Sequence, residues 1–217
     1  MDFKVAGNLV PSVLVTMDMN EHVFSEGGLL VYKDVSVHTS YTTLSKVTGS
    51  VTGAIVRSTL AKIPFYLLTY SGPGSCAFSR STVGEVRIAE LKEGETLDIA
   101  ENSIICAESS VKYDYFYVHG TTRVGRMIGF FMDKLTGPGK VAYHGHGTIL
   151  SFNLAEGESM SIDYGAILSK ESSVTIKTYN IPYGGGLLGH AMSFEAIEVT
   201  GPGKIEIETK DPKAKTL

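Results

Sequence analysis

The stretch Ser71-Gly-Pro-Gly74 occurs again as Thr136-Gly-Pro-Gly139 and as Thr200-Gly-Pro-Gly203. A phenylalanine stands seven residues before the first glycine of each copy, and alternating polar and apolar residues follow, as in a β-strand. Three copies of one pattern within 217 residues predict a protein made of internal repeats.

The Gly-Pro-Gly motif is interpreted as a tight corner that precedes a strand. Proline fixes φ near the value that a turn needs, and the flanking glycines can adopt positive φ or allow another backbone to approach. A phosphate-binding loop would need a helix start behind it, whereas a strand pattern such as Lys204-Ile-Glu-Ile-Glu208 follows here. The residues of this structural turn motif are Gly72, Pro73, Gly74, Gly137, Pro138, Gly139, Gly201, Pro202 and Gly203.

A second recurring element is an apolar residue, two spacers, Gly or Asn, and then Glu. Asn20, Gly94 and Gly157 tolerate positive φ, so each predicts a reversal between two strands. A matched strand follows each reversal, at 30–37, 104–111 and 167–174. We interpret the repeated acids as structural turn residues that accept backbone N–H bonds. They are Glu21, Glu95 and Glu158, with Asp34, Glu108 and Glu171 at the matched strands.

The order of these parts divides the chain into three units at about 10–83, 84–146 and 147–210, followed by a short charged tail at 211–217 that we expect to be frayed. We expect one compact all-β domain in which the units bury their faces around a pseudo-threefold axis. In that arrangement the last strand, near 205–209, closes against the first, and the two termini lie close together.

Composition limits the classes of function. With 43% hydrophobic and 19% charged residues the chain can bury a core, and a net charge of −4 without a basic cluster argues against a nucleic-acid partner. Cys76 and Cys106 lack metal-site spacing and are expected to be free thiols. The chain opens without a signal-peptide pattern and contains no apolar run of membrane-spanning length, so we expect a cytoplasmic, soluble protein.

A connector rich in glycine and apolar residues lies between each matched strand and the next Gly-Pro-Gly motif, at 47–57, 119–129 and 183–192. Such connectors could cap the open ends of the strand assembly, which is the interpretation we favour. They could instead contact a protein partner or a membrane surface, and that alternative stays open.

His144-Gly-His146 is the candidate metal site, because alternate residues of a strand point to the same face. A third ligand would have to come from His190, Glu158, Asp163 or Glu195. The alternative is that both histidines lie unligated at a turn, and the stretch 79–84 that follows the first motif contains no histidine. His22, His38 and His119 occur singly, so we expect no catalytic residues and no cofactor.

The combination of Glu26-Gly-Gly-Leu-Leu-Val31, the phenylalanine before each turn motif and the terminal Thr200-Gly-Pro-Gly-Lys-Ile205 resembles the altered-inheritance-of-mitochondria protein twenty-four family, over about residues 14–208. The resemblance implies three fused domains similar to the tryptophan RNA-binding attenuation protein, each a short double-stranded β-helix. It implies no catalytic residues, and mitochondrial members are associated with inner-membrane organisation. Ile205-Glu-Ile-Glu208 departs from the family pattern, where Trp and Gln are common.

These observations favour a non-enzymatic binding or scaffold module that associates with itself as a homo-oligomer. RNA binding is not expected, because the chain is acidic and lacks a repeated Lys-Lys-Arg pattern. Two alternatives remain. One is a cupin-like metal-binding protein that uses His144 and His146, and the other is a peripheral membrane-associated organiser.

Overall fold

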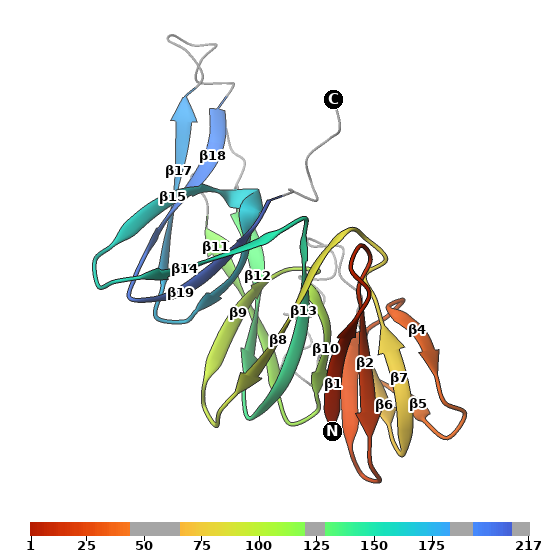
Figure 1. The fold of residues 1–217 in the computed structure, drawn as a ribbon. Helices are drawn as coiled ribbons and strands as arrows, with labels where there is room; N and C mark the ends of the chain where they lie inside the picture. Colours follow the sequence, from red (N-terminus) through yellow and green to blue (C-terminus); the bar gives the residue numbers. More distant parts are fainter. Residues whose placement is uncertain (44–65, 120–128, 183–192, 210–217) are drawn as a thin grey trace.

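The structure is a computed structural model that describes residues 1–43, 66–119, 129–182 and 193–209. Within these ranges the chain is all-β, as predicted, with antiparallel strands and one 3₁₀ turn, η1 (Tyr164–Ala166) (Figure 1). The connectors near 47–57, 119–129 and 183–192 lie almost entirely outside the described residues, as does the tail at 211–217.

The strands of the described residues form four sheets. Two sheets have six strands each, one has four strands and one has three. The four-stranded sheet has the order β1 (Asp2–Ala6), β2 (Ser12–Met17), β7 (Gly74–Phe78), β4 (Leu30–Lys33). The first six-stranded sheet has the order β5 (His38–Thr43), β6 (Tyr66–Ser71), β3 (His22–Glu26), β10 (Ile104–Glu108), β13 (Gly139–His146), β8 (Gly84–Leu91).

The remaining sheets use later parts of the chain. The second six-stranded sheet has the order β11 (Lys112–His119), β12 (Gly129–Thr136), β9 (Thr96–Ala100), β16 (Ile167–Glu171), β19 (Gly203–Glu208), β14 (Ile149–Leu154). The three-stranded sheet has the order β15 (Ser159–Asp163), β18 (Ser193–Thr200), β17 (Thr175–Pro182). Both six-stranded sheets thus combine strands from consecutive parts of the chain.

The predicted closure of the last strand against the first is wrong. β19 pairs with β14 and β16, whereas β1 pairs with β2 at the far side of the four-stranded sheet. The physical reason is that consecutive parts of the chain share a sheet, so the sheets follow one another in a row and the first and last strands lie in different sheets (Figure 1).

The Gly-Pro-Gly motifs form corners before strands, as predicted, because β7, β13 and β19 each begin at the last glycine of a motif. These glycines have φ of 135° to 138°, a conformation that other residues rarely adopt. The first glycine of each motif is required for a different reason. A Cβ at Gly137 would lie 2.3 Å from the backbone oxygen of Lys92, so the turn leaves no room for a side chain.

The reversals before the repeated glutamates also match the prediction. Asn20, Gly94 and Gly157 have φ of 70°, 76° and 75°. One carboxylate oxygen of each following glutamate accepts a hydrogen bond from the backbone N–H three residues earlier, at 2.7 Å for Glu21, 2.9 Å for Glu95 and 2.8 Å for Glu158. The glutamate backbone oxygens accept from the first glycine of each Gly-Pro-Gly motif, which ties the two turn elements together.

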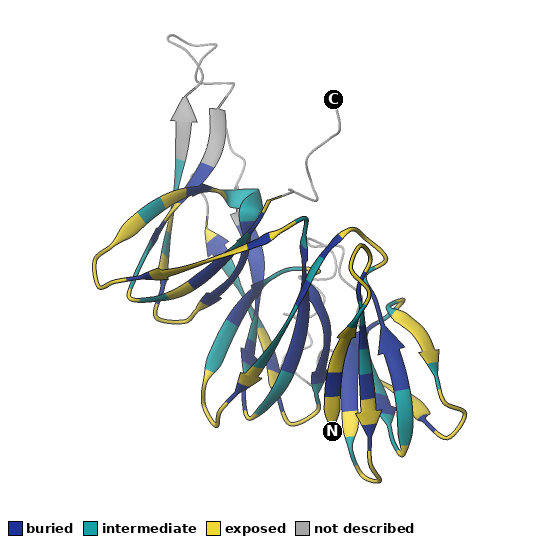
Figure 2. Cartoon of the chain, in the orientation of Figure 1, coloured by how far each residue is buried: buried dark blue, intermediate teal, exposed yellow. Residues whose placement is uncertain are grey.

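The core consists of apolar side chains buried between the sheets (Figure 2). Cys76 and Cys106 belong to this core and are free thiols, as predicted. Burial raises the pKa of the Cys76 thiol to about 12, and it raises the pKa of the Cys106 thiol as well. Both residues therefore serve as small apolar core side chains and are not reactive thiolates at neutral pH.

Candidate binding pocket

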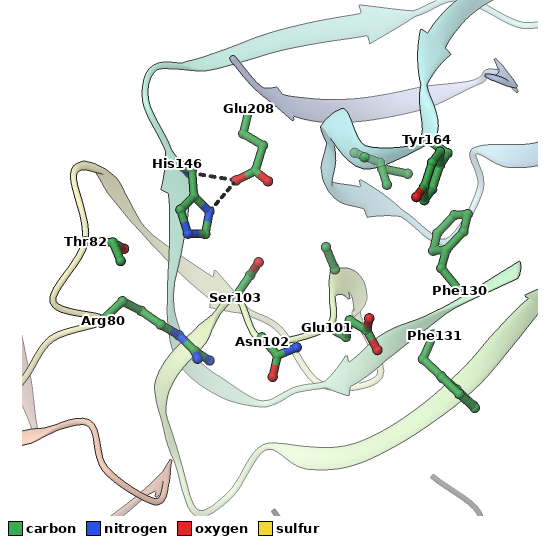
Figure 3. Close-up of a pocket in the computed structure, with 13 residues that line it drawn as sticks. Arg80, Thr82, Glu101, Asn102, Ser103, Phe130, Phe131, His146, Tyr164 and Glu208 are labelled. Carbon is green, nitrogen blue, oxygen red and sulfur yellow. Dashed lines mark hydrogen bonds and ion pairs between the residues drawn. The ribbon is translucent and has the colours of Figure 1, made fainter. Parts of the chain in front are cut away.

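A pocket of about 370 Å³ lies between the two six-stranded sheets (Figure 3). Its walls come from the segment between β7 and β8, the turn between β9 and β10, the beginning of β12, the ends of β13 and β19, and the region around η1. The labelled residues that line it are Arg80, Thr82, Glu101, Asn102, Ser103, Phe130, Phe131, His146, Tyr164 and Glu208.

Arg80 provides the cationic side of the pocket, and hydrogen bonds to residues outside the pocket hold its guanidinium group in place. Its Nη2 atom donates to Glu26 Oε2 at 2.7 Å and to the backbone oxygen of Ile104 at 2.5 Å. Both side chains of the Arg80–Glu26 ion pair are largely buried, at 13% and 6% exposure. Among the described residues the guanidinium Nε, which is itself buried, has no hydrogen-bond partner.

The floor of the pocket is the turn between β9 and β10. Asn102 has a positive φ of 63°, which is tolerated by asparagine better than by most residues, and Ser103 N–H closes the turn on the backbone oxygen of Ala100 at 3.2 Å. The backbone oxygen of Ser103 then accepts from the N–H of His144 at 2.8 Å. The turn is therefore fixed to β13, the strand that carries His146.

His146 and Glu208 form the opposite polar wall. One oxygen of Glu208 accepts the backbone N–H of His146 at 2.6 Å and lies 3.1 Å from His146 Nδ1 (Figure 3). The Glu208 side chain is only 3% exposed. The contact with the carboxylate favours a proton on Nδ1 and fixes the orientation of the ring.

Aromatic rings form the apolar wall. Phe130 and Phe131 on β12 are 8% and 9% exposed, and the rings of Phe130 and Tyr164 lie 6.3 Å apart. The pocket therefore combines stacking surfaces with a cation, an oriented imidazole and a buried carboxylate. Such a combination suits a small ligand that has both a ring and polar groups.

His144 lies beside this pocket but does not line it. Its ring is 5.0 Å from that of His146 and perpendicular to it, so the two imidazoles are neighbours, as their spacing predicts. His144 is 1% exposed, and among the described residues neither of its ring nitrogens makes a hydrogen bond of good geometry. Burial, reinforced by the neighbouring His146, lowers the pKa of His144 to about 4, so the ring is neutral at physiological pH.

Among the described residues, none completes a metal site with this pair. Within the described ranges no group of three or more His, Cys, Asp or Glu side chains is arranged to hold a metal ion. Of the predicted third ligands, Glu158 accepts from the backbone of Ala155 and Asp163 accepts from the backbone of Gly165. His190 and the side chain of Glu195 lie outside the described residues.

The buried neutral state of His144 predicts a loss of stability in acid. The unfolded chain binds a proton at this residue below about pH 6.5, whereas the folded protein binds it only near pH 4. Between pH 7 and pH 5 the free energy of unfolding therefore falls by about 2 kcal/mol because of this group. Urea titrations at both pH values measure the difference.

The matched variants for this experiment are His144→Gln and His38→Gln, since His38 is exposed on β5. We expect the glutamine at 144 to remove most of the stability difference between pH 7 and pH 5, and the glutamine at 38 to retain it. An equal loss in all three proteins would show that His144 is not the group that titrates.

Sequence reasoning singled out His146 but missed most of the pocket. Arg80, Asn102 and Ser103 each lie in turns and gave no repeating signal. Glu206 and Glu208 belong to the segment Ile205-Glu-Ile-Glu208, which the sequence analysis singled out as unusual. Glu206 is 1% exposed and accepts hydrogen bonds from Tyr143, Ser169, Lys204 and Ser151.

Within the described residues, His146 forms no hydrogen bond with a serine or cysteine nucleophile.

These features define an all-β protein of consecutive antiparallel sheets with a mixed polar and aromatic pocket between two of them. A family model described as mitochondrial biogenesis AIM24 matches residues 3–210, and the chain belongs to this family. The resemblance seen in the sequence is therefore confirmed.

One solved structure that resembles the chain is an X-ray crystal structure of a protein from Streptococcus pyogenes. It shares 20% sequence identity with a TM-score of 0.71, and the match covers 97% of this chain and 94% of that one. This likeness supports the fold. The search of curated proteins found no match. No helix among the described residues is long and apolar enough to cross a membrane.

Proposed function

We propose that the chain is a non-enzymatic binding or scaffold module that associates with itself, built from three fused repeats similar to the attenuation protein. The observation that carries this proposal is an exposed apolar strand at one end of the row of sheets. We call it the β4 edge, and it consists of Leu30, Val31, Tyr32 and Val35, which are 38%, 58%, 45% and 99% exposed.

The β4 edge is unusual because the corresponding strands elsewhere in the chain are buried. Aligning the three sequence units places Val31 with Ile105 on β10 and with Leu168 on β16. Ile105 and Leu168 are both 0% exposed, whereas Val31 is more than half exposed. Figure 2 shows β4 largely exposed and β10 buried. The matched strand is therefore covered by another strand in the second and third units, and it is exposed in the first unit.

An exposed apolar edge strand favours pairing with another strand, because the backbone groups on its open side and its exposed apolar side chains can both be buried by a partner. A second copy of the chain can supply such a strand, since the chain already makes two strand contacts of this kind internally. The pocket at His146 and Glu208 gives the assembled module a place to bind a small ligand, which is the binding part of the proposal.

Self-association through the β4 edge is tested with Val31→Lys. A lysine there is solvated in the single chain but would be buried without a partner in an assembly, which costs several kcal/mol. We expect the association constant to fall by more than about 100-fold, or roughly 3 kcal/mol. Sedimentation velocity over a range of concentrations measures it.

Val83→Lys is the matched control, because Val83 is 48% exposed and lies between β7 and β8, away from the β4 edge. It should assemble like the unmodified chain. A protein that stays a single chain at every concentration, or one that assembles equally well with lysine at position 31, would contradict the proposal.

A further inference from the structure

We infer that β15 of one copy pairs antiparallel with β4 of the next copy, in a head-to-tail contact that reproduces the two strand contacts inside the chain. This inference rests on the proposed self-association and specifies its surface. Its partner is a second copy of the same chain.

The two internal contacts have the same construction. In the first six-stranded sheet, the half β5-β6-β3 meets the half β10-β13-β8 through β3 and β10. In the second, the half β11-β12-β9 meets the half β16-β19-β14 through β9 and β16. Each contact therefore joins the strand after a reversal in one unit to the matched strand of the next unit.

Each of the two smaller sheets corresponds to one half of a six-stranded sheet, and neither has a contact of this kind with another half. The three-stranded sheet ends at β15, the strand after the third reversal, and the four-stranded sheet ends at β4, the first matched strand. β1 adds a further strand at the far side of the four-stranded sheet and leaves β4 free. Joining β15 to β4 would complete a sheet in the same order as the two internal ones.

The register of the proposed contact follows from the internal ones. Glu108 lies opposite Val23 and Ala107 opposite Phe24, while Lys170 lies opposite Asp98. Aligning the units by their repeated acids transfers this register to β4 and β15. Lys33 of one copy then lies opposite Ser161 of the next, Asp34 opposite Met160, and Tyr32 opposite Ile162.

Burial supports both sides of the contact. Ala107 and Lys170 are 0% and 6% exposed, whereas the corresponding Lys33 is half-buried at the open edge. Phe24 and Asp98 are 7% and 3% exposed, whereas the corresponding Ser161 is exposed. The two edges are thus open at the positions that the internal contacts cover.

The chemistry of the facing residues is compatible with pairing. The internal contacts use an apolar pair, Phe24 with Ala107, and an ion pair in which Lys170 Nζ lies 2.7 Å from Asp98 Oδ2. Lys33 opposite Ser161 places no like charges together. Lys33 Nζ donates to the backbone oxygen of Val37 at 2.7 Å, so its charge already has a partner within its own copy.

A backbone hydrogen bond beside the first internal contact also supports the proposed register. Ser109 N–H donates to the backbone oxygen of His22 at 2.9 Å, which connects the two halves beyond the paired strands. The corresponding residues at the open edges are Val35 and Ser159. Val35 is 99% exposed and Ser159 is exposed as well, so both are available to a second copy.

β4 and β15 lie at opposite ends of the row of sheets, so the contact joins different copies (Figure 1). The two surfaces are different, which makes the interface heterologous. Such an interface produces a closed ring or an open filament, and it does not stop at a dimer related by a twofold axis.

The test is disulfide crosslinking of the double variant Lys33→Cys with Ser161→Cys under mild oxidation. Residues directly opposite each other on antiparallel strands have Cα atoms about 4.5–5.5 Å apart, within the range for a disulfide. The native Cys76 and Cys106 are buried and do not compete. We expect a ladder of covalently linked chains beyond the dimer on a non-reducing gel, and its loss on reduction.

Val35→Cys with Ser159→Cys is the second pair, in case cysteine at position 33 weakens assembly. Lys33→Cys with Val83→Cys is the control and should give no ladder. If the unmodified chain assembles but both test pairs give no ladder, or stop at dimers, the head-to-tail contact is wrong while self-association stands. If the unmodified chain remains single at every concentration, both proposals fail.

Discussion

Replacing Asp98 with alanine is expected to lower the free energy of unfolding by about 3–5 kcal/mol. Asp98 and Lys170 form an ion pair between β9 and β16, and their side chains are only 4% and 7% exposed. Removing the carboxylate leaves the ammonium group buried, where the described residues offer it the backbone oxygen of Glu171, at 3.4 Å, and the ring of Phe116. Urea denaturation of Asp98→Ala measures the loss.

The first internal contact suggests the matched control for this variant. Its corresponding residues are Phe24 and Ala107, so Asp98→Phe with Lys170→Ala copies that contact into the second one. Replacing a buried ion pair by well-packed apolar residues is often neutral or stabilising. We expect the double variant to recover most of the stability. A double variant as unstable as Asp98→Ala would show that the two contacts are not interchangeable.

Alanine at Gly137 should lower the free energy of unfolding by about 3 kcal/mol, at the upper end of the usual cost of overpacking. The new Cβ would lie 2.3 Å from the backbone oxygen of Lys92 and 2.7 Å from Leu91 Cβ, so the backbone itself would have to shift. Thermal or urea unfolding of Gly137→Ala measures the effect.

Gly94→Ala separates this steric cost from the cost of backbone conformation. Gly94 has a φ of 76° and no atom within 4 Å of an added Cβ, so alanine there should cost only about 1–2 kcal/mol. Equal losses at positions 94 and 137 would mean that close packing is not what requires glycine in the Gly-Pro-Gly motif.

Local structure could be predicted from the sequence because local residues determine it. The corners at Gly74, Gly139 and Gly203 and the reversals at Asn20 and Gly94 depend on backbone conformations that few residue types adopt. The turn carboxylates followed from the same reasoning, since an acid beside a reversal can accept the N–H groups that the turn leaves unpaired.

The arrangement of the units could not be predicted in the same way. Three similar units are compatible with a closed ring or with an open row, and the choice depends on sheet contacts between residues far apart in the chain, such as Ser25 with Cys106. The prediction that the last strand closes against the first was wrong. In an open row the two end strands keep free edges, which is the origin of the exposed β4.

The pocket was harder to predict because its residues come from several elements. Arg80 depends on Glu26 for its position, and His146 depends on Glu208. These partners are 54 and 62 residues apart in the sequence, and none of them recurs in every unit. The repeated pattern that identifies the fold therefore does not indicate which residues form the pocket.

Native mass spectrometry of the purified, unmodified chain is the most direct test of the central claim that this protein assembles through its open strands. We predict a mass equal to several chains, falling to that of one chain in Val31→Lys but not in Val83→Lys. The same spectrum shows any retained small ligand as excess mass. A mass of one chain for the unmodified protein, at every concentration that the instrument accepts, would contradict the account.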